Sequence, residues 1–203
     1  MENDLHYLLP NFLHEVLALV WAERWDWFFG IRINIGCDLR KPRFVPDTFL
    51  SIGVERVRDY DGRRYEYRVP EEKSIPILVM EIGSRNYRGE FTTKAKQYKE
   101  LGALYYVVYA PYRCRYPTLS VYRLIDGEYI LQPGNPVWLP EIGLGIGREE
   151  GIYMGREQEW VYWYDEQGKR LLTAEKRIQQ AKQRVKKLEE KLRALGVEPD
   201  SIT

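Results

Sequence analysis

The stretch that decides the fold is "SIPILVMEIG", Ser74 to Gly83. It is a short and almost unbroken apolar run, the pattern of a strand that is covered on both faces of a sheet. Its one carboxylate, Glu81, stands near the end of the run, two residues before Gly83. We therefore predict a central strand that acts as a rigid support for Glu81, as a functional group requires.

The segments around this strand predict the rest of the sheet. A helix that ends at Gly102 follows it, and a second apolar run, Ala103–Ala110, comes next. A strand, a helix and a strand in this order predict two parallel strands joined by a right-handed crossover. Ile31–Arg40 alternates apolar and other residues, and a hairpin is expected to turn at Asp126–Gly127. The pattern indicates an α/β domain with a mixed sheet.

Helical spacing also predicts a helix from Asn11, as N-cap, to about Trp27. Its apolar face comprises Phe12, Val16, Leu19 and Val20. Glu15 lies on the same face, and either points inward or is solvated at the edge of the stripe. Near the other end of the domain, the glycine-rich and aromatic segment 143–171 is expected to form loops and short strands over a sheet edge.

The tail differs from the body in charge and pattern. The whole chain of 203 residues carries a net charge of +1, yet Thr173–Leu195 has eight Lys and Arg against three Asp and Glu. Apolar residues recur in it at spacings of three and four, the pattern of a coiled-coil seam: Ile178, Ala181, Val185, Leu188, Leu192 and Leu195. We predict two parts, 1–172 and 173–203, with the helix ending at Gly196 and Pro199. The helix either pairs with a second copy in a homodimer or packs on its own domain.

Other classes of protein find little support in the sequence. The two cysteines have no metal-binding spacing, and the acidic N-terminus lacks the charge pattern of a signal peptide. The longest apolar run near the N-terminus is too short to span a bilayer. We expect a cytoplasmic protein that has no membrane partner and no small-molecule cofactor.

One pair of acids stands out as a candidate metal site. Asp47 precedes the apolar run "TFLSI", and Glu81 ends the central strand. If the two strands are neighbours, both carboxylates converge at one end of the sheet. Mg²⁺ is suited to one or two carboxylates together with water and phosphate, and Mn²⁺ is a plausible substitute. Lys94, near the start of the crossover helix, could stabilise charge on a phosphoryl group there.

Four ordered motifs together resemble the Uma family of restriction endonucleases, within the PD-(D/E)XK nuclease superfamily. They are "VPD" (Val45–Asp47), "VMEIGS" (Val79–Ser84), "KAKQYKELGALYYVVYAP" (Lys94–Pro111) and the late "GLGIG…WVYWYDEQGKRLLT" (Gly143–Thr173). The resemblance covers nearly the whole chain. It implies a restriction-endonuclease-like fold, with a mixed central sheet flanked by helices and a basic, coiled-coil-like helix at the C-terminus.

The resemblance also implies roles for single residues. Asp47 and Glu81 match the two metal-binding acids, and Glu15 matches an acid of the N-terminal helix. The superfamily's usual lysine would stand two residues after Glu81, where this chain has Gly83. Lys94, four residues before Tyr98, matches the family's helix-borne lysine instead.

The function that the resemblance implies is Mg²⁺-dependent hydrolysis of DNA phosphodiester bonds. The alternative is a non-catalytic DNA-binding or accessory protein on a nuclease fold, for which the missing lysine leaves room. In either case a basic cluster beside the acids could contact phosphates, unless it is only a solvated helix face: Arg85, Arg88, Lys94, Lys96 and Lys99.

Overall fold

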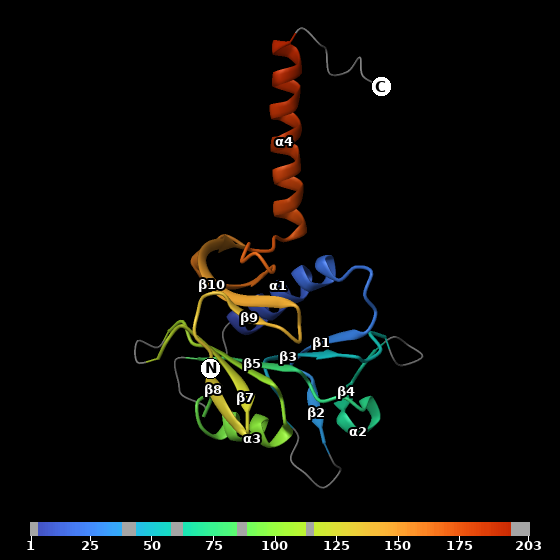
Figure 1. The fold of residues 1–203 in the computed structure, drawn as a ribbon, viewed down its shortest axis with the longest axis vertical. Helices are drawn as coiled ribbons and strands as arrows, with labels where there is room; N and C mark the ends of the chain where they lie inside the picture. Colours follow the sequence, from blue (N-terminus) through green and yellow to red (C-terminus); the bar gives the residue numbers. More distant parts are fainter. Residues whose placement is uncertain (1–3, 38–43, 58–62, 85–88, 113–115, 196–203) are drawn as a thin grey trace. The chain divides into compact units, whose positions relative to one another are not determined.

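The predicted central strand is present as β5 (Leu78–Ile82) in the computed structural model, and every residue of β5 is buried. The structure describes residues 4–37, 44–57, 63–84, 89–112 and 116–195. The chain divides into two compact units, Met1–Leu171 and Leu172–Thr203, which are described separately below. Figure 1 shows their elements. None of the helices in the described ranges is long and apolar enough to cross a membrane.

A mixed sheet of six strands forms the centre of the first unit. The strand order is β1-β3-β5-β6-β7-β8, with bounds Trp27–Ile31, Thr48–Ile52, Leu78–Ile82, Tyr105–Tyr109, Leu119–Ile125 and Glu128–Leu131. Only β5 and β6 run parallel, and helix α3 (Thr93–Leu101) joins them. Every other neighbouring pair is antiparallel, including the β7–β8 hairpin that turns at Asp126–Gly127. The predicted mixed α/β sheet, its crossover and this hairpin are confirmed.

One face of the sheet is covered by helix α1 (Leu5–Val20) and by a second sheet (Figure 1). That sheet has the order β11-β10-β9, formed by Arg156–Tyr164, Leu144–Tyr153 and Val137–Leu139. From β5 this core receives Leu78, Met80 and Ile82. The indole Nε1 of Trp163 donates a hydrogen bond to the carbonyl of Leu13 at 3.1 Å, which fastens β11 to α1.

The other face is covered by α3 and by a small parallel sheet of β2 (Asn34–Gly36) and β4 (Glu66–Arg68), which continues into the short α2 (Val69–Glu72). Val79 of β5 packs on this side, together with Tyr98 of α3. Because side chains alternate along a strand, Glu81 points to the same face as Val79. The alternation therefore turns the one carboxylate of β5 toward α3.

Three elements differ from the sequence-based expectation. Helix α1 begins at Leu5 rather than Asn11 and contains Pro10, because Leu5 and Leu9 extend its buried face and offset the missing backbone donor. The alternating run that begins at Ile31 does not form one strand, because Arg32 has a positive φ of 52° between β1 and β2. Its last residues, 38–40, lie outside the described residues.

The third difference is the segment 143–171, which forms the long β10–β11 hairpin rather than loops and short strands. Glycine in this hairpin does not interrupt the strands but allows a side chain of the paired strand to lie against the backbone. A Cβ at Gly151 would lie only 2.1 Å from the hydroxyl of Tyr162 on the paired strand.

The second unit contains helix α4 (Ala174–Ala194). The Thr173 side chain caps its first turn by accepting a hydrogen bond from the backbone N–H of Lys176, at 3.4 Å. No residue of α4 is buried. The predicted terminators Gly196 and Pro199 lie outside the described residues.

Candidate active site

Asp47 and Glu81 lie at the same end of the sheet because their strands are antiparallel neighbours. Thr48 of β3 is opposite Met80 of β5, so the residue just before β3 stands beside the last residues of β5. The Oδ2 atom of Asp47 accepts a hydrogen bond from the backbone N–H of Ile82, at 2.8 Å. This bond continues the pairing of the two strands and fixes the Asp47 carboxylate next to Glu81.

Both oxygens of the Glu81 carboxylate accept hydrogen bonds from α3. Lys94 Nζ lies 2.5 Å from Oε2, and the hydroxyl of Tyr98 lies 2.5 Å from Oε1. Lys94 and Tyr98 are four residues apart and so share one face of the helix. Glu81 is fully buried, whereas 27% of the Lys94 side chain is exposed. The lysine thus connects a buried acid to the surface.

The electrostatics of the site centre on Glu81. The pKa of Glu81 is raised to about 7, because burial and the neighbouring charge of Asp47 outweigh the lowering effects of Lys94 and Tyr98. Burial and the charge of Glu81 also raise the pKa of Tyr98, so its hydroxyl remains a hydrogen-bond donor. A carboxyl group with a pKa near neutrality, close to a second acid and a lysine, is typical of a functional site.

Replacing Tyr98 by Phe removes one donor from Glu81 but keeps the ring that packs against Phe44 and Tyr106. We expect the free energy of unfolding to fall by about 1–3 kcal/mol. The hydrogen bond from Tyr98 favours the ionised form of Glu81, so its removal should raise the pKa of Glu81 further. The loss of unfolding free energy should therefore be larger at pH 8 than at pH 6. Denaturant unfolding at both pH values measures the effect.

The matched control is Tyr129→Phe, which removes a hydrogen bond from Tyr129 to the neutral carbonyl of Ala103, at 2.8 Å. This variant should lose similar stability at both pH values. Equal pH dependence of the two variants would contradict the assignment of Tyr98 as the residue that supports the ionised Glu81.

Gly83 occupies the position where the resemblance leads one to expect a lysine, and the structure gives a physical reason for the glycine. Its N–H donates to the carbonyl of Tyr109 at 2.7 Å, which brings the ends of β5 and β6 together. A Cβ at Gly83 would lie 3.1 Å from Cβ of Ala110 and 3.4 Å from the carbonyl oxygen of Tyr109. A side chain here would be crowded, and Lys94 supplies the ammonium from α3 instead.

The other residues predicted for the site lie elsewhere or are engaged differently. Glu15 is carried by α1, which packs on the face of the sheet opposite to Glu81 and α3, so its role stays a prediction. In the basic cluster, Lys99 pairs with Glu128 at 2.9 Å, and Lys96 pairs with Glu100 at 3.9 Å. Arg85 and Arg88 lie outside the described residues.

Sequence reasoning missed how two residues of the site, Tyr98 and Glu90, are engaged. Tyr98 was recognised as a neighbour of Lys94 but not as a donor to Glu81, although their spacing of four residues was a usable signal. Glu90 is a second acid that is buried, with 2% of its surface exposed. Its carbonyl accepts a hydrogen bond from Tyr106 at 2.6 Å, and its charge, like that of Glu81, raises the pKa of this tyrosine beyond the effect of burial. No sequence signal reveals that Glu90 is buried.

The acids present fit a magnesium ion that is completed by water and substrate. In the part of the chain that the structure describes, no group of three or more His, Cys, Asp and Glu side chains could hold a metal. Mg²⁺ commonly uses only one or two carboxylates and takes its remaining ligands from water and phosphate oxygens. Each Glu81 oxygen accepts a hydrogen bond from α3 and has a second lone pair, and the Asp47 bond to Ile82 is made through Oδ2, which leaves Oδ1 for a cation.

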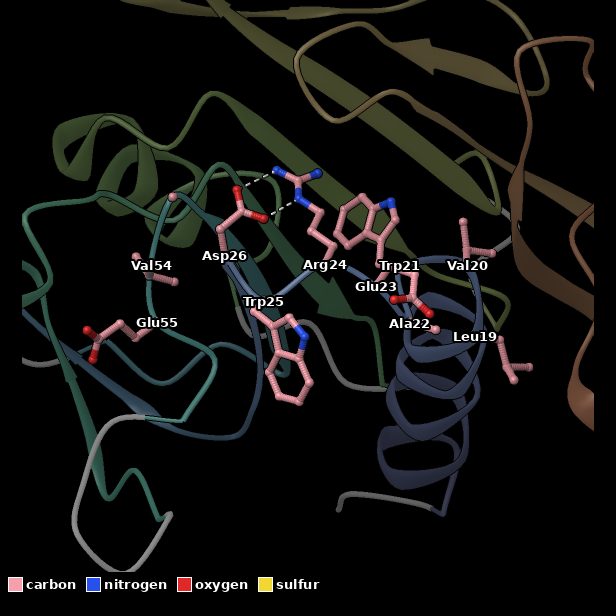
Figure 2. Close-up of a pocket in the computed structure, with 11 residues that line it drawn as sticks. Leu19, Val20, Trp21, Ala22, Glu23, Arg24, Trp25, Asp26, Val54 and Glu55 are labelled. Atoms are coloured by element: carbon pink, nitrogen blue, oxygen red, sulfur yellow. Dashed lines mark hydrogen bonds and ion pairs between the residues drawn. The ribbon is translucent and has the colours of Figure 1, made fainter.

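A cavity of about 900 Å³ lies at the opposite end of β3 from Asp47 (Figure 2). Its lining comes from the end of α1, the turn into β1 and the residues after β3: Leu19–Asp26 and Gly53–Glu55. Trp25 is 66% exposed there, and Arg24 pairs with Asp26. None of the lining residues belongs to the Asp47–Glu81–Lys94 set, so this cavity is separate from the candidate active site.

Comparison with known proteins links this geometry to a family. The model of the Uma2 family, described as "Putative restriction endonuclease", matches residues 3–149. The matched part contains Asp47, Glu81, Lys94 and Tyr98. No curated protein matches the chain.

The fold is similar to that in a crystal structure described as "a putative nuclease" from Anabaena variabilis ATCC 29413. The TM-score is 0.51 and the sequence identity 17%, with 70% of this chain and 75% of that chain covered. At this identity the likeness concerns the fold alone. Because the family model spans well over half of the sequence, the chain belongs to the Uma2 family of nuclease-like proteins.

Proposed function

We propose that this protein is a divalent-metal-dependent endonuclease that hydrolyses phosphodiester bonds in DNA. The observation that carries the proposal is the pair of contacts made by Glu81. This buried acid lies next to Asp47 and pairs with Lys94, whose side chain is partly exposed to solvent. Membership of a restriction-endonuclease family supports the same reading.

The residues of the chain have distinct roles in this proposal. Asp47 and Glu81 hold Mg²⁺, or Mn²⁺ in its place, which when bound lowers the pKa of water and neutralises charge on the phosphoryl group. Tyr98 orients the Glu81 carboxylate. Lys94 is partly exposed, so its ammonium can contact a non-bridging phosphate oxygen and stabilise the charge that develops during in-line displacement.

A second candidate function is non-catalytic DNA binding by an accessory protein on the same fold. Gly83, in the position of the usual lysine, is the observation that favours it. The two functions differ in what they need: binding through phosphates depends on salt and not on metal, whereas cleavage depends on both.

Plasmid DNA incubated with the full chain should be cleaved in Mg²⁺ or Mn²⁺ and remain intact in EDTA. Lys94→Ala should lower the rate by about 100-fold, because one well-placed donor to a developing charge contributes on this scale. The matched control is Lys96→Ala, on the same helix with a side chain that is 75% exposed. Its rate should stay near that of the wild type.

The assay also has outcomes that count against the proposal. An equal loss in the two lysine variants would show that α3 acts only through its overall charge. A wild-type chain that binds DNA in a salt-dependent manner but cuts neither DNA nor RNA with any divalent metal would reject the enzyme and favour the accessory protein.

A further inference from the structure

Helix α4 presents an apolar stripe that is left uncovered in the second unit. Ile178, Val185, Leu188 and Leu195 are each more than half exposed, at 55%, 53%, 51% and 78%. Most of the stability of a helix in a protein comes from the packing of its apolar face rather than from intrinsic propensity. Burial of this stripe is therefore the obvious source of the helix's stability.

The residue types on the stripe indicate what covers it. In heptad positions, Ile178, Val185 and Leu192 occupy a, and Ala181, Leu188 and Leu195 occupy d. β-Branched residues at a together with leucine at d favour two-stranded, parallel coiled coils. A second copy of the same helix is the partner that meets this pattern.

The flanking charges select the direction of pairing. The g positions Arg177, Arg184 and Lys191 are all cationic, so an antiparallel pair, which sets g against g, would repel along one whole flank. In a parallel pair each g residue faces the e residue five positions later in the partner. Arg184 then faces Glu189, which is attractive, and Arg177 faces Lys182, which is repulsive.

We propose that α4 pairs with α4 of a second copy of this chain as a parallel two-stranded coiled coil. In a parallel coil both α4 helices begin at the same end, so the first unit of each copy is attached at that end. Two candidate active sites would thereby be carried by one assembly, one for each strand of a duplex. The pairing itself is independent of whether the site is catalytic.

Sedimentation equilibrium of the full chain over a range of concentrations tests the pairing. The wild type should be a dimer that dissociates on dilution. Leu188→Glu, which places a charge in the seam, should be a monomer. Gln183→Glu, at the outward f position, is the matched control and should remain a dimer. A wild type that is monomeric at all concentrations, or a Leu188→Glu variant that is still dimeric, would overturn the proposal.

Near-ultraviolet circular dichroism of the first unit accompanies each variant. Its aromatic residues, such as Trp163, are buried in the core of that unit, so their signal should not change. A monomer with an unchanged signal supports the coiled coil. A monomer obtained only with loss of this signal would show that association depends on the first unit, and would count against pairing through α4.

A charge substitution tests the direction. Lys182→Glu turns both repulsive Arg177–Lys182 contacts of the parallel dimer into attractive ones, and at low salt the dissociation constant should fall about fivefold. In an antiparallel pair the same change makes the e positions 182 and 189 both acidic, so the constant should rise. Gln183→Glu again serves as the control. Like Lys182→Glu, it places a glutamate four residues before a lysine of the same helix, but position 183 does not face the partner. A rise for Lys182→Glu would overturn the parallel arrangement.

Discussion

Replacing Asp47 by Asn should abolish metal-dependent cleavage of DNA, with a loss of about a thousandfold in rate, or roughly 4 kcal/mol of transition-state stabilisation. Asn removes one of the two negative charges that would hold the cation in the proposed metal site. The change should leave the fold intact, because the amide oxygen can still accept the hydrogen bond from the N–H of Ile82.

Single-turnover cleavage and Mn²⁺ binding, followed by electron paramagnetic resonance, measure the loss separately. Asp26→Asn is the matched control, since Asp26 lies just before β1, lines the cavity at the other end of β3 and pairs with Arg24. It should bind metal and cleave like the wild type. If the Asp47→Asn variant bound Mn²⁺ as tightly as the wild type, Asp47 would not be a ligand of the metal.

The second large effect is on the pH dependence of stability. The pKa of Glu81 is about 7 in the folded protein, against 4.5 for the unperturbed group. Between these values the native state holds more protons than the unfolded state, so the free energy of unfolding falls as pH rises. The contribution is fully present below about pH 4.5 and is lost as pH passes through 7, amounting to roughly 3 kcal/mol.

Glu81→Gln isolates this contribution. Glutamine imitates the protonated acid, keeps an acceptor for Tyr98 and does not titrate, while the partly exposed Lys94 can turn to water. Denaturant unfolding from pH 4.5 to 8.5 should therefore show that the wild type loses stability relative to the variant as the pH rises. A difference that does not change with pH would show that Glu81 is ionised throughout.

Magnesium should oppose this loss in the wild type. A cation bound to Glu81 favours the ionised carboxylate, so Mg²⁺ should raise the melting temperature more at pH 8 than at pH 5. Glu81→Gln should show little of this stabilisation. An equal effect of Mg²⁺ on both proteins would place the bound metal elsewhere.

The sequence was sufficient for the elements with simple signals. The apolar run ending at Glu81 and the glycine that ends α3 at Gly102 predicted a strand, a helix and a crossover, since each depends on local patterning. The approach of Asp47 to Glu81 required only that the two strands be neighbours, and this is what the register of β3 and β5 provides.

What the sequence could not supply depends on tertiary packing. Pro10 reads as a helix breaker, and only the burial of Leu5 and Leu9 against the sheets explains a helix that runs through it. The position of Glu15 on the opposite face from α3 follows from how α1 packs rather than from its spacing. Likewise, the raised pKa of Glu81 comes from complete burial, which one acid in an apolar run does not reveal.

The bond between Asp47 and the backbone of Ile82 has a consequence for observing the site in solution. One amide proton of the central strand is held by a side chain of the proposed metal centre, not by a neighbouring backbone carbonyl. Its resonance and its rate of exchange with deuterium therefore follow the state of that carboxylate. The Ile82 amide is therefore a built-in probe of the Asp47 carboxylate that needs no substitution of the chain.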